Sequence, residues 1–260
     1  MTSQEDLQTL IKVTNKDRDF FLVLSGYMMT GKDVEILIES CDDIDSFLTE
    51  LDMDGIGLDY LPYNIKKLVN LSSININRNE LICLPDSIGD LINLNELYVE
   101  RNRLEFVPES IGKLINLRRL SLEENNIKVL PSSIRNLTNL EELSLVGNKI
   151  TDLPESIGNA LNLKRLNLAL NKLTNLPDDI TKLTSLVELD LSSNQLISLP
   201  DNIGNLTQLK HLDLGSNNFT GFPDSFFNLT SLTYLRIKEN NLLNISEIKN
   251  KFNRPIAIEY

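Results

Sequence analysis

Residues 117–139, LRRLSLEENNIKVLPSSIRNLTN, set the architecture of this chain, because the same phrase returns directly after them. LEELSLVGNKITDLPESIGNALN follows at 140–162, and LVELDLSSNQLISLPDNIGNLTQ stands at 186–208. The copies share the pattern L-x-x-L-x-L-x-x-N-x-L-x-x-L-P-x-x-I-x-x-L-x-x. Nine copies run without an insertion, and they begin at Leu48, Leu71, Leu94, Leu117, Leu140, Leu163, Leu186, Leu209 and Leu232. An internal period of 23 residues predicts a solenoid of stacked coils.

Each half of the repeat predicts its own local structure. The L-x-L alternation turns two leucines inward and the residue between them outward, as in a short strand. Strands that recur once per coil must stack in parallel. The P-x-x-I-x-x-L half spaces its apolar residues three apart, which suits a 3₁₀ or single helical turn on the opposite side. The expected fold is therefore an α/β solenoid, with a curved parallel sheet on the concave face and short turns on the convex face.

An asparagine recurs at one place in the pattern, at Asn79, Asn102, Asn125, Asn148, Asn171, Asn194, Asn217 and Asn240. A buried asparagine at a turn bonds free backbone groups of its own coil and of the neighbouring coil, so this column predicts a ladder. Loss of one member would leave backbone polar groups unpaired, at a cost of roughly 1–3 kcal/mol.

The phrase is the signature of leucine-rich repeats, and the chain resembles that family over about residues 48–245. Its 23-residue form with Leu-Pro is similar to the repeats of Ras-group-related scaffold proteins and of leucine-rich-repeat proteins from some bacteria, including spirochaetes. Departures from the pattern are few: Ile56 replaces Asn, Ala160 replaces Leu, and Ile245-Ser246 replaces Leu-Pro. The first and last departures suit terminal repeats, which are usually atypical.

Both ends of the repeat array predict caps. Residues 1–47 read as an N-terminal cap, with a short amphipathic helix in MTSQEDLQTLIKVT and an irregular repeat of strand, turn and helix over about 19–47. The repeats occupy 48–245. Residues 246–260 read as a C-terminal cap, in which SEIKNKF forms a short helix and PIAIEY adds a strand over the open sheet edge.

The stretch GYMMTGKD, residues 26–33, lies one residue away from the phosphate-binding pattern G-x-x-x-x-G-K-[ST]. It supports an alternative function, an enzyme or nucleotide-binding regulator. However, Asp33 stands where such a loop needs a hydroxyl for Mg²⁺. Thr30-x-x-Asp33 instead predicts a helix cap, with the carboxylate in the first turn, where negative charge is favoured.

Other enzyme-like or metal-like groupings are weak. Cys41-Asp42-Asp43 matches the C-x-D of some bacterial ubiquitin ligases, but no room remains for that domain. ELDMDGIGLDYL, from Glu50, resembles a calcium loop, yet Leu61 stands where its bidentate Glu belongs. His211 lies at an outward strand position without an assignable catalytic partner. We therefore expect no catalytic residue, no metal and no cofactor.

Charge and composition limit the partners. The net charge is −12, and residues 1–60 hold 14 acidic and 4 basic side chains. An acidic head argues against nucleic acid and anionic membranes, which both reward clustered Lys and Arg. The N-terminus lacks a secretory signal pattern, no apolar run could span a bilayer, and Cys41 and Cys83 are expected as free thiols. These features predict a cytoplasmic protein; a secreted bacterial effector or a trimmed leader is the alternative.

Outward positions of L-x-x-L-x-L-x-x-N on the concave face are the expected contact surface. In the middle copies they combine a small apolar spot with an aromatic and charged rim, a composition that protein interfaces favour. The predicted partner-binding residues are Tyr98, Glu100, Arg101, Arg119, Glu123, Val146, Arg165, Asn167, Ala169 and Leu170. Asp190 and Asp213 continue an acidic column toward the C-terminus.

The sequence thus predicts a non-catalytic protein-protein interaction module that binds an unidentified protein on its concave face. An intracellular scaffold and a bacterial host-interacting protein both fit. We expect a monomer. Phe227 replaces the glycine found at this position in other copies, and weak self-association through its ring is the alternative to its capping the last coil.

Overall fold

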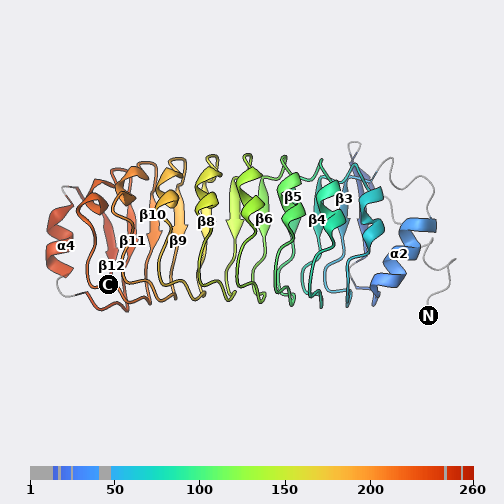
Figure 1. Cartoon of the computed structure of the whole chain (residues 1–260), viewed down its shortest axis with the longest axis horizontal. Coiled ribbons are helices and arrows are strands. Elements are labelled where there is room, and N and C mark those ends of the chain that lie inside the picture. The colour runs from blue at the N-terminus through green and yellow to red at the C-terminus, as the bar shows by residue number, and fades with distance from the viewer. Residues whose placement is uncertain (1–13, 17–18, 25, 41–47, 243–244, 253) are drawn as a thin grey trace.

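The computed structural model describes residues 14–16, 19–24, 26–40, 48–242, 245–252 and 254–260. Their strands form one sheet in the order β1 to β12, and every pair from β2 onward is parallel. Figure 1 shows the coils stacked along one axis, from α2 at one end to α4 at the other. The strands are β1 Thr14–Lys16, β2 Asp19–Val23, β3 Glu50–Asp52, β4 Ser73–Asn75, β5 Glu96–Tyr98, β6 Arg119–Ser121, β7 Glu142–Ser144, β8 Arg165–Asn167, β9 Glu188–Asp190, β10 His211–Asp213, β11 Tyr234–Arg236 and β12 Ala257–Glu259.

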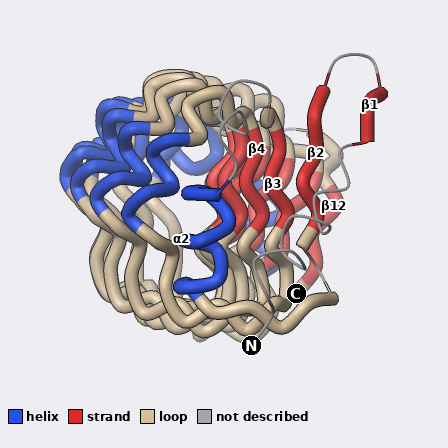
Figure 2. Tube along the Cα trace, turned by 90° about the vertical axis from the view of Figure 1, so that its right-hand side faces the viewer, coloured by secondary structure: helices blue, strands red, loops and turns tan. Residues whose placement is uncertain are grey.

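Short 3₁₀ helices form the opposite side of each coil, so the expected α/β solenoid is confirmed (Figure 2). Each lies just after the proline of its repeat. Proline suits this place because its fixed φ allows an extended residue to lead directly into a helical turn. They are η1 Tyr63–Lys67, η2 Asp86–Asp90, η3 Glu109–Lys113, η4 Ser132–Asn136, η5 Glu155–Asn159, η6 Asp178–Lys182, η7 Ile203–Asn205 and η8 Asp224–Asn228.

The core is a continuous column of aliphatic side chains between the strands and the 3₁₀ turns. In the coil that begins at Leu117, Leu120 and Leu122 point inward from the strand side, and Ile134 meets them from η4. All three are at most 2% exposed. Because every coil repeats this arrangement, each leucine packs on its own equivalents above and below, and the outward residues are left to face solvent.

The asparagine ladder exists as expected. Asn148 accepts a hydrogen bond from the backbone N–H of Ile127 at 3.0 Å, across to the preceding coil. Its amide donates to the carbonyl of Leu122 at 2.9 Å, in that same coil, and to the carbonyl of Leu145 at 3.0 Å. Each asparagine from Asn79 to Asn240 makes the same two bonds to the preceding coil, and all but Asn102 also bond the carbonyl three residues earlier, which satisfies backbone groups where the strands end.

Glycines on the convex side allow the 3₁₀ turns of neighbouring coils to pack closely against each other. A side chain at Gly112 would place its Cβ 2.6 Å from Cβ of Ser133 and 2.7 Å from its carbonyl oxygen. Gly89 and Gly204 meet the next coil in the same way. Gly89 faces Ser110, whose hydroxyl is buried and has no partner among the described residues. Close backbone packing here takes precedence over side-chain hydrogen bonding.

The N-terminal end consists of the antiparallel pair β1–β2 and helix α2, Gly31–Ser40. Thr14, which the sequence placed in an amphipathic helix, lies in a strand because β1 pairs with β2. The rest of that expected helix and Cys41 fall outside the described residues. Helix α2 packs against η1 and buries Val34, Leu37 and Ile38, so it covers the end of the core.

The C-terminal end has the expected helix and strand, α4 Ile245–Lys251 and β12. β12 pairs with β11 in parallel and extends the sheet. Phe252 lies 5.2 Å from the ring of Phe227 and 5.6 Å from that of Phe226, both centroid to centroid. Phe227 is thus half-buried against the C-terminal cap. Its ring stands where Gly112, Gly158 and Gly204 stand in other coils, and α4 rather than another 3₁₀ turn follows it.

Candidate functional site

The concave face carries a groove of about 800 Å³ that runs across the strands from β5 to β11. Its floor is the outer surface of the sheet, and the buried leucines of each strand lie beneath it. Outward residues at the two ends of each three-residue strand form its lining, together with residues just past the strand ends. The lining residues that bear on function are Tyr98, Glu100, Arg119, Ser121, Glu123, Glu142, Ser144, Arg165, Asn167, Glu188, Asp190, His211, Asp213 and Tyr234.

A ladder of alternating charges crosses the first half of this face. The parallel register sets Glu96 beside Arg119, Arg119 beside Glu142, and Glu142 beside Arg165. Arg119 contacts both glutamates, with its Nε 3.1 Å from Glu142, and Arg165 also contacts Glu142. We call these four residues the charge ladder. Each member has a partner on a neighbouring strand, so their charges cancel within the protein.

The ladder also sets the protonation of its members. Burial by itself would raise the pKa of the Glu142 carboxyl, but hydrogen bonds from Arg165 and Arg119 lower it below its ordinary value. The hydrogen bonds that Arg119 donates to Glu142 and Glu96 raise the pKa of its guanidinium group. Glu142 therefore stays ionised well into the acid range, and the two arginines are held in place over the sheet.

Small residues, Ser121 and Ser144, line the floor of the groove at β6 and β7. Ser121 is 7% exposed, and its hydroxyl has no partner among the described residues. The hydroxyl of Ser144 donates to Glu123 at 2.6 Å. On the side of β5 the ring of Tyr98 closes the floor, and its hydroxyl donates to Glu96 at 3.1 Å. Burial and the Glu96 carboxylate raise the pKa of Tyr98, so the phenol stays neutral.

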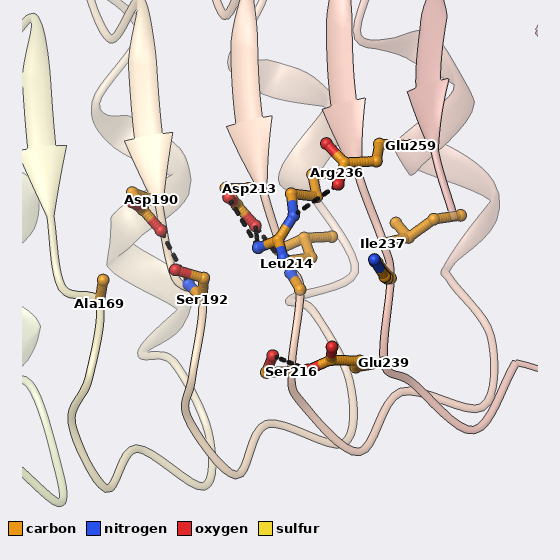
Figure 3. A network of polar contacts seen from close by, with 12 residues as sticks. Ala169, Asp190, Ser192, Asp213, Leu214, Ser216, Arg236, Ile237, Glu239 and Glu259 are labelled. Carbon is orange, nitrogen blue, oxygen red and sulfur yellow. Dashed lines mark hydrogen bonds and ion pairs between the residues drawn. The ribbon is translucent and has the colours of Figure 1, made fainter.

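Carboxylates dominate the second half of the groove (Figure 3). Asp190 and Asp213 occupy adjacent positions on β9 and β10. Asp190 accepts the N–H of Ser192 at 2.9 Å, and Asp213 lies 3.3 Å from Arg236. The pKa of the Asp213 carboxyl is raised, mainly by burial and also by the charge of Asp190. The N–H of Gly215 and the charge of Arg236 lower this pKa, but they offset only part of the rise.

Six of the ten residues predicted from the sequence line this groove: Tyr98, Glu100, Arg119, Glu123, Arg165 and Asn167. They come together because the strands stack in register. Arg101 lies outside it, at the turn after β5, where its φ is 52° and its guanidinium bonds Glu124 at 3.1 Å.

The apolar spot expected in the middle of the concave face, Val146, Ala169 and Leu170, does not line this groove, and its contact with a partner stays a prediction. Val146 and Ala169 stand just past the strand ends, and neither lines the groove. Ala169 is only 7% exposed. Leu170 is 57% exposed, but its φ of 56° belongs to the turn that leaves the sheet. Leu170 stands beyond the three-residue strand β8, whereas Val146 and Ala169 hold the repeat position at which the longer side chains of Glu100 and Glu123 do line the groove.

Sequence reasoning did not include Glu142, Ser144, Glu188 and His211 in the site. A signal for the ladder was present in the letters before the second leucine of each copy, which read Glu96, Arg119, Glu142, Arg165 and Glu188 in order. Opposite charges on directly paired strands attract, so this alternation predicts cross-strand contacts once the register is known.

The N-terminus of α2 does not have the form of a phosphate site. Thr30 donates its N–H to Asp33 at 2.9 Å and its hydroxyl to the same carboxylate at 2.7 Å, which confirms the expected cap. The N–H of Gly31 donates to Asp59 at 2.8 Å, and Lys32 pairs with Glu35 at 2.9 Å. The groups that would hold a phosphate are thus bonded to carboxylates of the chain itself. The Thr30 bonds also lower the pKa of Asp33.

The stretch from Glu50 that resembles a calcium loop, and His211, have structural contacts of their own. Asp54 pairs with Arg78 of the next coil, and Asp52 accepts the N–H of Asp54 at 3.0 Å. Within the described parts of the chain no group of three or more His, Cys, Asp or Glu residues could hold a metal ion. His211 is exposed beside Glu188, with Nδ1 3.8 Å from the carboxylate. The helices of the described ranges include none that is long and apolar enough to cross a membrane.

Comparisons with known proteins agree with this architecture. The family described as "Leucine-rich repeat region" matches residues 105–195, and two further families, both described as leucine rich repeat, match 198–242 and 185–206. No curated protein sequence matches significantly.

Solved structures give the same result. The ectodomain of the receptor kinase GASSHO1/SCHENGEN3 from Arabidopsis thaliana, in complex with CASPARIAN STRIP INTEGRITY FACTOR 2, is 27% identical with a TM-score of 0.73. The Arabidopsis receptor kinase HAESA, in complex with the peptide hormone IDA and the co-receptor SERK1, is 28% identical with a TM-score of 0.71. Each alignment covers 88% of this chain, which spans only 28% and 41% of the respective receptor chains.

Proposed function

Since the chain is a leucine-rich-repeat protein, we propose that it acts as a non-catalytic adaptor whose concave groove binds an extended segment of another protein. The proposal rests on one observation above all: the outer face of β5 to β11 carries a groove of about 800 Å³ whose side chains differ from strand to strand. A face of that kind is where solenoid proteins offer an extended binding surface.

The fixed positions of the lining residues support recognition. The charge ladder ties Arg119 and Arg165 to glutamates on neighbouring strands, so a partner meets side chains that are already ordered. Ordering these side chains beforehand reduces the entropy lost on binding. The similar receptor HAESA was solved with the peptide hormone IDA bound, and the GASSHO1/SCHENGEN3 ectodomain with CASPARIAN STRIP INTEGRITY FACTOR 2, which makes a peptide-like partner the first to test.

The proposed compartment is the cytoplasm, and the proposed role is that of a scaffold; delivery of a bacterial protein to bind host factors is the second role we retain. Cys83 is exposed and free. An exposed thiol is typical of a reducing compartment, where disulfides are rare. Fractionation of cells that express the full chain would test the compartment directly.

The binding face is tested by crosslinking from defined positions. A photoreactive amino acid is placed at Ser144, in the groove floor, and in a matched protein at Arg135, exposed on η4 of the convex side. We expect a partner from cell lysate to crosslink at position 144 and not at 135, and its purified form to compete. A partner that crosslinks only from position 135 would overturn the concave site.

A further inference from the structure

The groove of the proposed function is not uniform in charge along its length. Among the described side chains that line it, six are carboxylates and two are guanidinium groups. In the first half, Arg119 and Arg165 are balanced by Glu142 within the groove and by Glu96 at its margin. The excess of negative charge therefore comes from Glu100 and Glu123, just past β5 and β6, and from a denser group of three carboxylates over β9 and β10.

Glu188, Asp190 and Asp213 form this denser group, which we call the acidic end of the groove. Glu188 and Asp190 stand on β9, and Asp213 is the cross-strand neighbour of Asp190. Like charges on directly paired strands repel each other, and a cation between them would relieve the repulsion. Two arginines neighbour this end. Arg165 is the cross-strand neighbour of Glu188 but pairs with Glu142. Arg236 is shared between Asp213 and Glu259 on β12, so the two arginines supply only part of the compensation.

Aromatic groups border the acidic end. His211 and Tyr234 follow Glu188 along the same column of the sheet, with ring centroids 6.2 Å apart. Both line the groove. A cation that reaches the carboxylates from solvent passes beside these rings, and an aromatic face next to a carboxylate suits the flat guanidinium of arginine as well as the ammonium of lysine.

We propose that the groove takes a basic, extended peptide segment of the partner and that one of its Lys or Arg side chains docks against Glu188, Asp190 and Asp213. This inference rests on the proposed function and adds the chemistry and direction of the ligand. Six strand spacings of about 4.8 Å place β5 and β11 roughly 29 Å apart, which an extended segment of about nine residues spans. The basic end of the segment lies over β9 and β10, and its uncharged part lies over the serine floor of β6 and β7.

The test is a selection from a display library of random nine-residue peptides, carried out on the full chain. We expect the recovered peptides to be enriched in Lys and Arg. Their affinity should fall at least tenfold in the triple variant Glu188→Gln, Asp190→Asn, Asp213→Asn, and it should fall as salt is raised. The amides keep acceptors for the N–H groups of Ser192 and Gly215, so the turns after β9 and β10 persist.

A matched control removes three charges elsewhere: Glu105→Gln, Asp152→Asn and Asp201→Asn, all exposed and outside the groove. It should leave peptide affinity unchanged. If the triple variant loses its cooperative thermal transition, Glu188→Gln alone, at an exposed position, carries the test, with a loss of at least threefold expected.

Each other outcome overturns the inference. Recovered peptides without a Lys or Arg excess, or peptides that bind the triple variant and the parent alike, would show that the acidic end does not select the ligand. Failure to recover any binding peptide would also overturn it. The adaptor function is judged separately, because crosslinking from position 144 to a protein partner does not depend on the charge of that partner.

Discussion

The side chain of Asn148 joins two coils of the solenoid, because its amide donates to the carbonyl of Leu122 at 2.9 Å while its oxygen accepts from the preceding coil. Asn148→Ala leaves these buried backbone groups without partners. We expect the free energy of unfolding to fall by roughly 1–3 kcal/mol. Urea melts measure it, with Asn175→Ala, at an exposed position, as the control.

Asn167 also points outward from the sheet, but it would be a poor control for Asn148→Ala. Its side chain accepts a hydrogen bond from the N–H of Ala169 at 3.0 Å, so its removal is not silent. A small loss is therefore expected at Asn167→Ala. Equal losses for Asn148→Ala and Asn175→Ala would contradict the ladder.

The convex packing predicts a pair of opposite glycine effects. Gly112→Ala places a methyl group 2.6 Å from Cβ of Ser133 and should destabilise the fold by about 1–3 kcal/mol, because the coils must move apart. Gly221→Ala meets nothing within 4 Å and has no positive φ, so it should be neutral or stabilise by up to about 1 kcal/mol. Thermal melts of the two variants decide the matter; a stable Gly112→Ala protein would refute the close packing.

The ladder predicts a dependence of stability on pH. Hydrogen bonds from two arginines lower the pKa of Glu142 in the folded protein. Its stabilising contribution is thus complete above the unfolded-state pKa of about 4.3 and is lost as pH falls through the lower folded-state pKa. Between pH 7 and pH 3 the parent should lose more stability than Glu142→Gln. The control, Glu105→Gln, should lose as much as the parent; parallel curves for all three proteins would argue against the ladder.

Nucleotide binding by GYMMTGKD is not expected, because Asp33 and Asp59 already bond the N–H groups at the start of α2. Titration of labelled ATP or GTP with Mg²⁺ should show no saturable binding below millimolar concentration. Tight binding that disappears in Lys32→Ala would reverse this conclusion.

Blocking the groove should abolish partner binding. Ser144→Tyr places a large ring on the floor of the groove, and we expect affinity for the crosslinked partner to fall more than tenfold. Tyr98→Ala should cost more than about 1 kcal/mol of binding free energy, as a central aromatic contact does. Leu170→Glu should have the smaller effect, since Leu170 lies outside the groove. Calorimetry with purified partner measures all three.

The matched control for this series is Arg135→Tyr, on the convex side. Glu259 at the edge of the sheet is unsuitable, because it accepts a hydrogen bond from Tyr234 at 2.8 Å and pairs with Arg236 at 3.2 Å. Unchanged binding by both Ser144→Tyr and Tyr98→Ala, with loss in Arg135→Tyr, would place the partner on the other face.

The fold and its stabilising devices were readable from the sequence. The period of 23 residues, the L-x-L alternation and the recurring asparagine predicted the parallel sheet, the 3₁₀ turns and the ladder. The Thr30–Asp33 cap was predicted from four neighbouring residues. Local patterns suffice here, because each coil of a solenoid contacts only its neighbours and every coil repeats the same local solution.

The binding face depended on the tertiary structure. The repeat pattern marked which residues point outward, but the three-residue strands decided that Asn167 stays on the sheet while Leu170 leaves it. Charge pairing across coils joined Arg119 to Glu96 and Glu142, residues 23 positions away on either side. Such contacts depend on register, curvature and side-chain reach together, and none of these is encoded in any single copy of the repeat.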